Sequence, residues 1–346
     1  MEVKQISKLT SEEKSDIDHL IDFCRFSTPF HKIEWLSIIE ELFNEKVYYL
    51  FHCDSRNKID FALPFILKKE YMYYNLCSFS SKYELVYGGP LFSSRTLLSE
   101  ISIDKAIVKD LKRVKSSSMT APPKFDIAYL NANKIKHIYN TLILDLKPSL
   151  NEICGSFKNK NVRRNIRKAI KSKVNASVNE NEKIEYFYEW LALTYNRFNK
   201  KMLPLSYYKA VCSLPFVQTF SAKFQGRTIA IMLILTHKNT IYYWAGSSSL
   251  NFRQYRPNDF LYWEIIKWAK NNGYEWFDLL ITHVEDLPGR SKFKLKFGGE
   301  IYPIYEYQLE DPIYQIISKS LCCLTHPRKM LEYISNPKRA IKKIWR

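Results

Sequence analysis

The chain has 346 residues, a formal net charge of +18 and a hydrophobic content of 46%. This length allows two domains of ordinary size, and the composition excludes a disordered or fibrous protein. The longest clean apolar run, residues 229–235, is too short to cross a bilayer, and the charged N-terminus lacks the apolar segment of a secretory signal. We therefore expect a cytoplasmic protein that can also work at the inner face of the membrane.

Positive charge is concentrated in two stretches. Residues 157–173 hold eight Lys and Arg and no acid, and residues 312–346 hold eight against Glu332 alone. Such local excess indicates an anionic partner, for example RNA, a nucleotide-linked precursor or an acidic membrane face. A solvated basic face without a partner explains the charge runs equally well. The seven cysteines show no CxxC pair and no metal-ligand spacing, so we expect no metal site.

The N-terminal part, residues 1–150, reads as helices followed by strands. Helical spacing covers residues 1–45. Alternating and aromatic runs predict strands at residues 47–53, 61–67, 71–79, 125–130 and 141–146, with a helix at 94–114 between the third and the fourth.

Residues 151–310 repeat this order of elements. A basic linker helix lies within residues 157–173, a second helical stretch covers 182–199, and strands are predicted at 217–224, 227–236, 240–245, 274–281 and 301–308. A helix separates the strands at 240–245 and 274–281. We expect Asn258 or Asp259 to cap its start and Gly273 to end it. Residues 311–346 form a basic amphipathic tail.

The order of elements indicates the fold class. Antiparallel strands in sequence, one late helix and a parallel-type return predict an α/β (α+β) fold, with mixed, mostly antiparallel sheets flanked by helices. This arrangement is that of the acyl-CoA N-acetyltransferase-like (GNAT) domain, here twice in tandem, at residues 1–150 and 151–310. No residue-level repeat accompanies the shared order, so any duplication is one of architecture.

Short motifs spread over residues 28–300 point to a family. They are Pro29-Phe30 with Trp35, Gly88-Gly89-Pro90-Leu91, the basic run 161–169, Tyr255-x-Pro257-Asn258, Phe277-Asp278, Phe293-Lys294 and Phe297-Gly298. In this order they resemble the FemABX-type peptidyl aminoacyltransferases and their GNAT-like relatives. The resemblance implies transfer of an amino acid from aminoacyl-tRNA to an amine of a peptidoglycan precursor, or action on another envelope glycan. The stretch after the basic helix is too short for the helical-hairpin arm of some members.

Two candidate catalytic residues follow from the implied attack of an amine on an acyl carbonyl. The resemblance assigns Lys294 to the acyl-transfer centre, where an ammonium would stabilise the tetrahedral oxyanion. Its spacing alone equally describes a surface lysine, because Lys292 and Lys296 flank it. Asp278 interrupts an apolar strand, where a carboxylate is costly unless it is paired. We expect Asp278 either to orient the incoming ammonium and accept its proton, or to cap a turn.

Two further groups of residues are candidates for substrate binding. Basic side chains on the linker helix suit the phosphates of tRNA or of a nucleotide-linked precursor, although they would also solvate a linker: Arg163, Arg164, Arg167 and Lys168. Aromatic and amide side chains near the second-half strands would line the acceptor groove, although aromatics at strand ends are more often core: Tyr243, Trp244, Tyr255, Asn258 and Phe293. His283 and Asp286 in the following loop are too few for a catalytic dyad.

We predict a transferase that moves an aminoacyl or acyl group onto an amine of a cell-envelope precursor, with no cofactor beyond the donor, aminoacyl-tRNA or acyl-CoA. The alternative enzyme is an acyl-CoA-dependent N-acyltransferase. Against CoA, residues 253–258 lack the glycines of a pyrophosphate loop, and Pro257 removes an N–H donor. A third reading is a non-catalytic RNA-binding or scaffold protein. The tail would contact an anionic membrane, pack against the domain or stay disordered, and the oligomeric state is open.

Overall fold

A computed structural model of the chain describes residues 1–70, 73–78, 81–94, 114–125, 134–180, 183–197, 201–282 and 289–310. Its helices are α1 Ser11–Phe23, α2 Ile33–Phe43, α5 Leu150–Gly155, α6 Lys160–Lys171, α7 Ile184–Arg197, α8 Leu205–Cys212, α9 Pro257–Asn271 and α10 Gly289–Leu295. Its strands are β1 Glu2–Gln5, β2 Val47–Cys53, β3 Ile59–Glu70, β4 Tyr73–Ser78, β5 Leu91–Phe92, β6 Val114–Thr120, β7 Ile135–Asp145, β8 Asn175–Val178, β9 Val217–Phe224, β10 Arg227–His237, β11 Thr240–Ser248, β12 Trp276–Thr282 and β13 Glu300–Glu310.

The longer predicted elements are confirmed. Strands β2 and β9 have the predicted bounds, and the basic helix is α6, with Val162, Ile166 and Ala169 buried beneath its charged face. The sequence missed β1, β5, β6, α5, α8, β8 and α10, none longer than eight residues, because so few residues show little periodicity. Several predictions concern residues outside the described part of the chain. These are the helix at 94–114, of which residues 95–113 are not described, most of the strand at 125–130, His283, Asp286 and the tail at 311–346.

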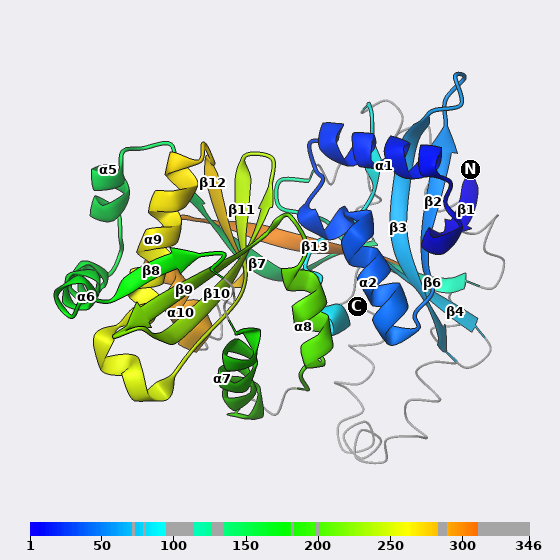
Figure 1. The fold of residues 1–346 in the computed structure, drawn as a ribbon. Coiled ribbons are helices and arrows are strands. Elements are labelled where there is room, and N and C mark those ends of the chain that lie inside the picture. The colour runs from blue at the N-terminus through cyan, green and yellow to red at the C-terminus, as the bar shows by residue number, and fades with distance from the viewer. Residues whose placement is uncertain are drawn as a thin grey trace, which may run out of the picture.

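The strands form one continuous sheet (Figure 1). Its order is β1-β2-β3-β4-β6-β13-β7-β12-β11-β10-β9-β8, and β5 pairs with β3. Each half is a meander of antiparallel strands followed by a parallel pair, β4 with β6 in the N-terminal half and β11 with β12 in the C-terminal half. The two predicted sheets are therefore present, and they join edge to edge.

The join is made by two strands that are far apart in the sequence. β7, which ends the N-terminal half in sequence, pairs antiparallel with β12 of the C-terminal half. β13, which closes the C-terminal half in sequence, pairs antiparallel with β6 of the N-terminal half. β7 and β13 also pair with each other, from Glu300 opposite Ile143 to Tyr307 opposite Ile135. This crossed arrangement fixes the two halves to one another at the middle of the sheet.

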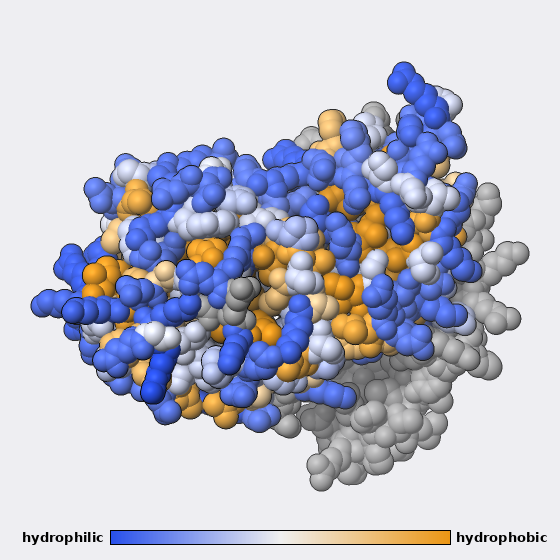
Figure 2. Space-filling model, viewed as in Figure 1, coloured by the Kyte–Doolittle hydropathy of each residue, from blue (hydrophilic) through white to orange (hydrophobic). Residues whose placement is uncertain are grey.

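Two hydrophobic clusters cover the sheet. One packs α5, α6 and α9 against one face of the C-terminal strands. The other extends from α1, α2 and the N-terminal strands to α7, α8 and the opposite face of the C-terminal strands. Because β10 lies between both sets of helices, residues 229–235 are all buried, which accounts for the continuous apolar run in the sequence. Figure 2 shows apolar residues where the halves meet and hydrophilic residues over the outer end at α6.

Candidate active site

The parallel pair of the C-terminal half separates soon after it begins. β11 and β12 pair at three positions, from Thr240 opposite Trp276 to Tyr242 opposite Asp278. Both strands then carry a register shift: β11 gains a residue at Trp244 against β10, and β12 gains one between Asp278 and Ile281 against β7. Leu280, within the second shift, has a positive φ of 55°. Bulges bend strands and are frequent beside active sites, so this opening, hereafter the splay, is the candidate site.

Asp278 lies at the start of the splay with 1% of its surface exposed. Its carboxylate accepts hydrogen bonds from the Thr141 hydroxyl, from the Leu280 backbone N–H at 2.7 Å and from the Tyr87 hydroxyl at 2.9 Å. Burial raises the pKa of the Asp278 carboxyl to about 6, and these hydrogen bonds and the charge of Lys294 oppose the rise. Asp278 is thus a buried, hydrogen-bonded carboxylate of raised pKa, and its bond from the Leu280 N–H also caps the local turn of β12.

Lys294 projects from α10 toward the same opening. Its ammonium donates hydrogen bonds to the backbone carbonyls of Leu279 and of Ile281, the latter at 2.8 Å. Both carbonyls belong to the part of β12 beyond its last pair with β11. The Lys294 side chain is 9% exposed, and its nitrogen lies 5.5 Å from the centroid of the Tyr243 ring. The residue is therefore a buried cation held within the splay, which excludes the surface-lysine interpretation.

Aromatic rings line this region. Tyr262 of α9 lies 5.1 Å from Tyr243 and 5.1 Å from Phe293, measured between ring centroids. A Cβ at Gly246 would come within 2.3 Å of the Tyr243 hydroxyl, so glycine leaves the space that this ring occupies. The structure thus brings Tyr243 and Phe293 together with Lys294 and places them on one side of the splay.

Polar contacts connect the basic helix to the turn that follows α10. Asn165 of α6 donates to Asp259 of α9 at 3.2 Å, and Asp259 forms an ion pair with Lys296, the first residue after α10. Arg163 is turned inward and donates to the carbonyls of Cys154 and Gly155 at the end of α5, at 2.9 and 3.1 Å. Of the four predicted basic residues, Arg163 therefore has a structural role in this conformation.

The other three basic candidates are exposed on α6: Arg164, Arg167 and Lys168. They form a solvent-facing basic strip on a helix that packs against α9, whose neighbour α10 bears Lys294. An anion bound by this strip would lie outside the splay rather than within it.

Three other predicted residues lie apart from the splay. Trp244 is 9% exposed, packs 5.1 Å from Trp35 and donates to the Glu84 carbonyl at 3.3 Å, which places it in the core between the halves. Tyr255 stacks on Phe224 at 4.1 Å. Asn258 donates to the Ser248 hydroxyl at 3.1 Å and so ties the first turn of α9 to the end of β11.

The predicted cap of α9 is wrong. The N-cap residue is Arg256, with φ of 57°, no side chain caps the helix, and Pro257 is the first helical residue. Asn258 and Asp259 lie two and three positions after the N-cap, inside the first turn, and their side chains are engaged elsewhere. Proline at the first helical position needs no N–H partner, which explains how the helix starts without a side-chain cap. The predicted end is confirmed, because Gly273 follows the helix with φ of 80°.

The sequence did not identify Tyr87 and Thr141, which complete the Asp278 cluster. Tyr87 comes immediately before the Gly88-Gly89-Pro90 motif, and this position was the available signal. Both residues precede Asp278 by more than a hundred positions and reach it through tertiary structure alone. Within the described ranges, no group of three or more His, Cys, Asp or Glu could hold a metal ion.

Comparisons with known proteins agree with this geometry. Residues 156–295, from just before α6 to the end of α10, match the family described as acetyltransferase (GNAT) domain. No curated protein sequence matches the chain. A crystal structure of FemX is similar over 92% of this chain and 100% of its own, with a TM-score of 0.67 and 15% identity.

Two further solved structures share the fold. The C-terminal domain of a putative lysylphosphatidylglycerol synthetase from Agrobacterium fabrum covers 90% of this chain and 95% of its own, with 10% identity and a TM-score of 0.56. The protein L-PGS from Bacillus licheniformis covers 86% and 92%, with 12% identity and a TM-score of 0.56.

The fold and the family match together define a transferase that contains a GNAT domain. More particularly, the chain contains a GNAT domain at residues 156–295, and over nearly its whole length it has the fold of the FemABX-type proteins. The predicted fold class and the predicted transferase class are confirmed. Among the described helices, none is long and apolar enough to span a membrane.

Proposed function

We propose that this protein transfers an aminoacyl group from aminoacyl-tRNA to an amine of a cell-envelope precursor. The observation that carries the proposal is the pairing, in one opening of the sheet, of a buried carboxyl of raised pKa with a buried ammonium: Asp278 and Lys294. The similarity to FemX and to two proteins named for lysylphosphatidylglycerol synthesis supports an aminoacyl donor and an envelope acceptor.

In the proposed reaction the acceptor nitrogen attacks the ester carbonyl of the donor. The C–N bond forms, the ester C–O bond breaks, the nitrogen loses a proton and the leaving ribose hydroxyl gains one. The ammonium of Lys294, held in the splay by two strand carbonyls, supplies positive charge where the tetrahedral oxyanion develops. In a site with little water such a charge is worth several kcal/mol of transition-state stabilisation, on the order of other oxyanion donors.

Asp278 supplies the proton acceptor. With a pKa of about 6 its carboxyl is ionised at neutral pH and lies close enough to neutrality to exchange a proton with an amine. Thr141 and Tyr87 hold the carboxylate in place through their hydroxyl groups. Tyr243 and Phe293 would form the wall against which the aminoacyl group lies.

The choice of donor rests on the helix that follows β11. In CoA-dependent enzymes of this fold, a glycine-containing loop presents backbone N–H groups to pyrophosphate. Here Pro257 occupies the first helical position and Arg256 the N-cap, so the helix start offers fewer N–H donors. The exposed strip Arg164, Arg167 and Lys168 on the neighbouring α6 suits the phosphates of an RNA donor.

The test uses two labelled donor pools, total aminoacyl-tRNA and mixed acyl-CoA, each incubated with an envelope-precursor extract. We expect label to move from the tRNA pool, and Lys294→Ala to abolish that transfer while Lys292→Ala, an exposed position on the same helix, leaves it unchanged. Label from the CoA pool would establish the acyl-CoA-dependent alternative. Salt-sensitive RNA binding without transfer from either pool would support the non-catalytic alternative.

A further inference from the structure

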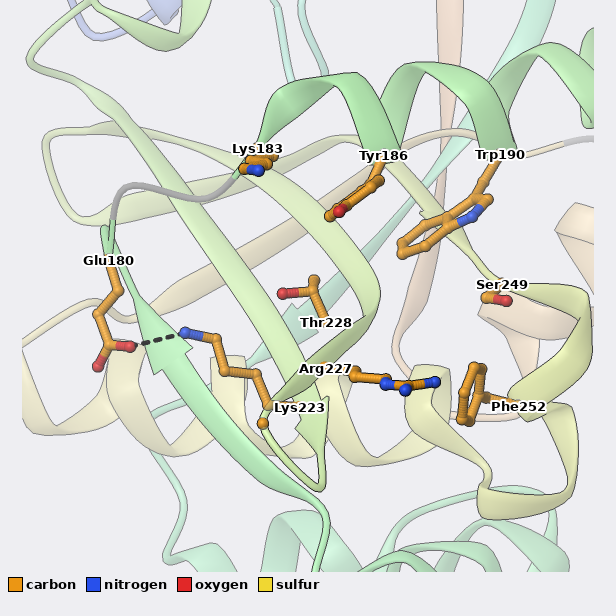
Figure 3. Close-up of a pocket in the computed structure, with 10 residues that line it drawn as sticks. Glu180, Lys183, Tyr186, Trp190, Lys223, Arg227, Thr228, Ser249 and Phe252 are labelled. Atoms are coloured by element: carbon orange, nitrogen blue, oxygen red, sulfur yellow. Dashed lines mark hydrogen bonds and ion pairs between the residues drawn. The ribbon is translucent and has the colours of Figure 1, made fainter.

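A second cavity lies away from the splay, at the outer end of the C-terminal half (Figure 3). It has a volume of about 470 Å³, and its lining residues do not include Asp278, Lys294 or Tyr243. Three segments enclose it: the start of α7, the turn of the β9–β10 hairpin and the segment Ser249–Phe252 that follows β11. Nothing in the proposed chemistry uses this space.

One wall of the cavity is aromatic. Tyr186 and Trp190, one turn apart on α7, stack with ring centroids 6.0 Å apart and planes 15° apart. Both rings project from α7 into the cavity in Figure 3, and Phe252 faces them from the other side. Tyr186 is 41% exposed and Trp190 is half-buried against the core, so the two rings together present an apolar surface to the cavity.

Most of the charged residues in the rest of the lining are cationic. Lys183 precedes the first residue of α7, and Arg227 lies at the start of β10, and both are exposed. Lys223 also lines the cavity and forms an ion pair with Glu180 at 2.9 Å. In Figure 3 the guanidinium of Arg227 lies beside the Phe252 ring, below Trp190. Three cations thus meet one carboxylate in this cavity, which favours an anionic ligand.

The walls are held by contacts within the fold. The buried hydroxyl of Ser247 donates to the Phe187 carbonyl of α7 at 2.8 Å, and the Ser249 backbone N–H donates to the Ile229 carbonyl at 2.9 Å. The hairpin turn has positive φ at Gln225 and Gly226, the pattern of a tight two-residue turn. The cavity is therefore formed before any ligand arrives, and its volume falls in the range of small-molecule sites.

We infer that this cavity binds a nucleotide, with the base against Tyr186 and Trp190 and a phosphate bound by Arg227 and Lys183. Base–aromatic stacking tolerates any base, and a guanidinium binds phosphate oxygens in pairs. An uncharged sugar would offer no anion to Arg227 and Lys183, and inorganic phosphate would leave the aromatic wall uncovered. The nucleotide could be part of a nucleotide-linked acceptor or of the end of an RNA donor. That choice of sources rests on the proposed function, whereas nucleotide binding does not.

Calorimetry with four small probes and an RNA trinucleotide tests the inference. Uridine diphosphate should bind at least about 10-fold more tightly than uridine or pyrophosphate, since each of these lacks one of the two contacts. Uridine diphosphate-N-acetylglucosamine represents the acceptor source, and the trinucleotide CCA the RNA source. Tighter binding of either one supports the inference and identifies the source.

Two variants locate the binding in this cavity. Arg227→Gln and Tyr186→Ala should each weaken binding of uridine diphosphate about 10-fold. The matched controls Arg197→Gln and Leu193→Ala, at exposed positions near the other end of α7, should change it less than about 2-fold. Binding that neither variant alters, or no binding of any nucleotide at millimolar concentration, would overturn the inference.

The proposed function is tested separately by Lys294→Ala. That variant should bind nucleotides normally even though transfer is lost. If the wild-type protein binds nucleotides but transfers no label, the cavity assignment stands and the proposed function is wrong. If it transfers label but binds no nucleotide, the proposed function stands and the cavity assignment is wrong.

Discussion

The two halves carry equivalent parallel strand pairs that differ at the point where chemistry would occur. In the N-terminal half, β4 and β6 stay paired over five positions, from Tyr74 opposite Val114 to Ser78 opposite Met119. In the C-terminal half, β11 and β12 pair at three positions and then separate. The open pair surrounds Asp278 and Lys294.

This difference indicates that the N-terminal half has a structural role and that the C-terminal half carries the reaction site. The closed pair resumes its pairing after one register shift, between Tyr74 and Asn75, and holds it to Ser78, which suits a structural part. In the open pair, a strand carbonyl accepts a hydrogen bond from the Lys294 ammonium instead of from a neighbouring strand. The buried Asp278 carboxylate accepts hydrogen bonds from the hydroxyls of Tyr87 and Thr141. Tyr87 comes from the N-terminal half, so that half completes the site of its neighbour.

The residues around Tyr87 connect the halves more widely. Glu84 accepts hydrogen bonds from the Tyr195 and Tyr208 hydroxyls at 2.5 and 2.9 Å, and the Tyr83 carbonyl accepts one from Tyr207 at 2.7 Å. All three tyrosines belong to α7 and α8. Because the same segment contacts Asp278 and these helices, the N-terminal half positions the C-terminal site instead of working independently.

The strongest test of the comparison is Lys294→Ala. If the open pair is the transfer centre, removing its ammonium should lower the transfer rate about 10²–10³-fold, as for other oxyanion donors. Lys292→Ala on the same helix should retain the wild-type rate. A single-turnover assay with saturating donor measures the rate directly. Equal rates in wild type and Lys294→Ala would show that transfer occurs elsewhere.

Asp278→Asn should have the next largest effect, about 10²-fold on transfer at neutral pH, because the proton acceptor is lost. The wild-type rate should fall as the pH drops below about 6, where the Asp278 carboxyl becomes protonated. The variant should lack this limb of the pH–rate profile. A limb near pH 6 that persists in Asp278→Asn would assign it to another group.

The same substitution changes stability with a defined sign. Burial raises the pKa of Asp278 from 3.8 to about 6, so between these values the native carboxyl keeps a proton that the unfolded chain has released. Its contribution to stability is therefore fully present below about pH 4 and is lost as the pH rises through about 6. From pH 4 to pH 7 the stability of Asp278→Asn should rise relative to wild type by on the order of 2–3 kcal/mol. Denaturant unfolding at both pH values measures the difference.

Tyr87→Phe tests whether the N-terminal half contributes to the site in the C-terminal half. The substitution removes the hydroxyl that donates to Asp278 at 2.9 Å, so the pKa of Asp278 should rise and the acidic limb should move to higher pH. The loss of one such hydrogen bond predicts about a 5–10-fold lower rate at neutral pH. Tyr302→Phe, whose hydroxyl donates to the exposed Glu300, is the matched control. An unchanged pH–rate profile in Tyr87→Phe would show that the N-terminal half does not influence the pKa of Asp278.

The smallest expected effect concerns the basic strip of α6. Arg167→Gln should raise the KM for the RNA donor about 2–5-fold and reduce its salt dependence, with little change in kcat. Arg56→Gln removes the same charge from an exposed turn of the N-terminal half and should have no effect. Equal effects of the two substitutions would mean that α6 contributes only to overall charge.

The sequence predicted the long elements because their periodicity is local. The run at 229–235, the stripe of α6 and Gly273 after α9 each report a local packing or backbone requirement. Phe293-Lys294 and Asp278 could be identified from the family motif and from the cost of a carboxylate in an apolar strand. The crossing of β7 and β13, the contacts of Tyr87 and Thr141 with Asp278, and the burial of Trp244 depend on contacts between distant residues, which no local pattern contains.

One measurement tests most directly that the open pair is the transfer centre. A donor RNA whose amino acid bears a photoreactive side chain would be crosslinked to the protein, and mass spectrometry would identify the attached peptides. The account predicts attachment within β11 or α10, at residues 240–248 or 289–295, with little attachment to β4 or β6. Attachment to residues 73–78 or 114–120 would contradict it and assign the reaction to the closed pair.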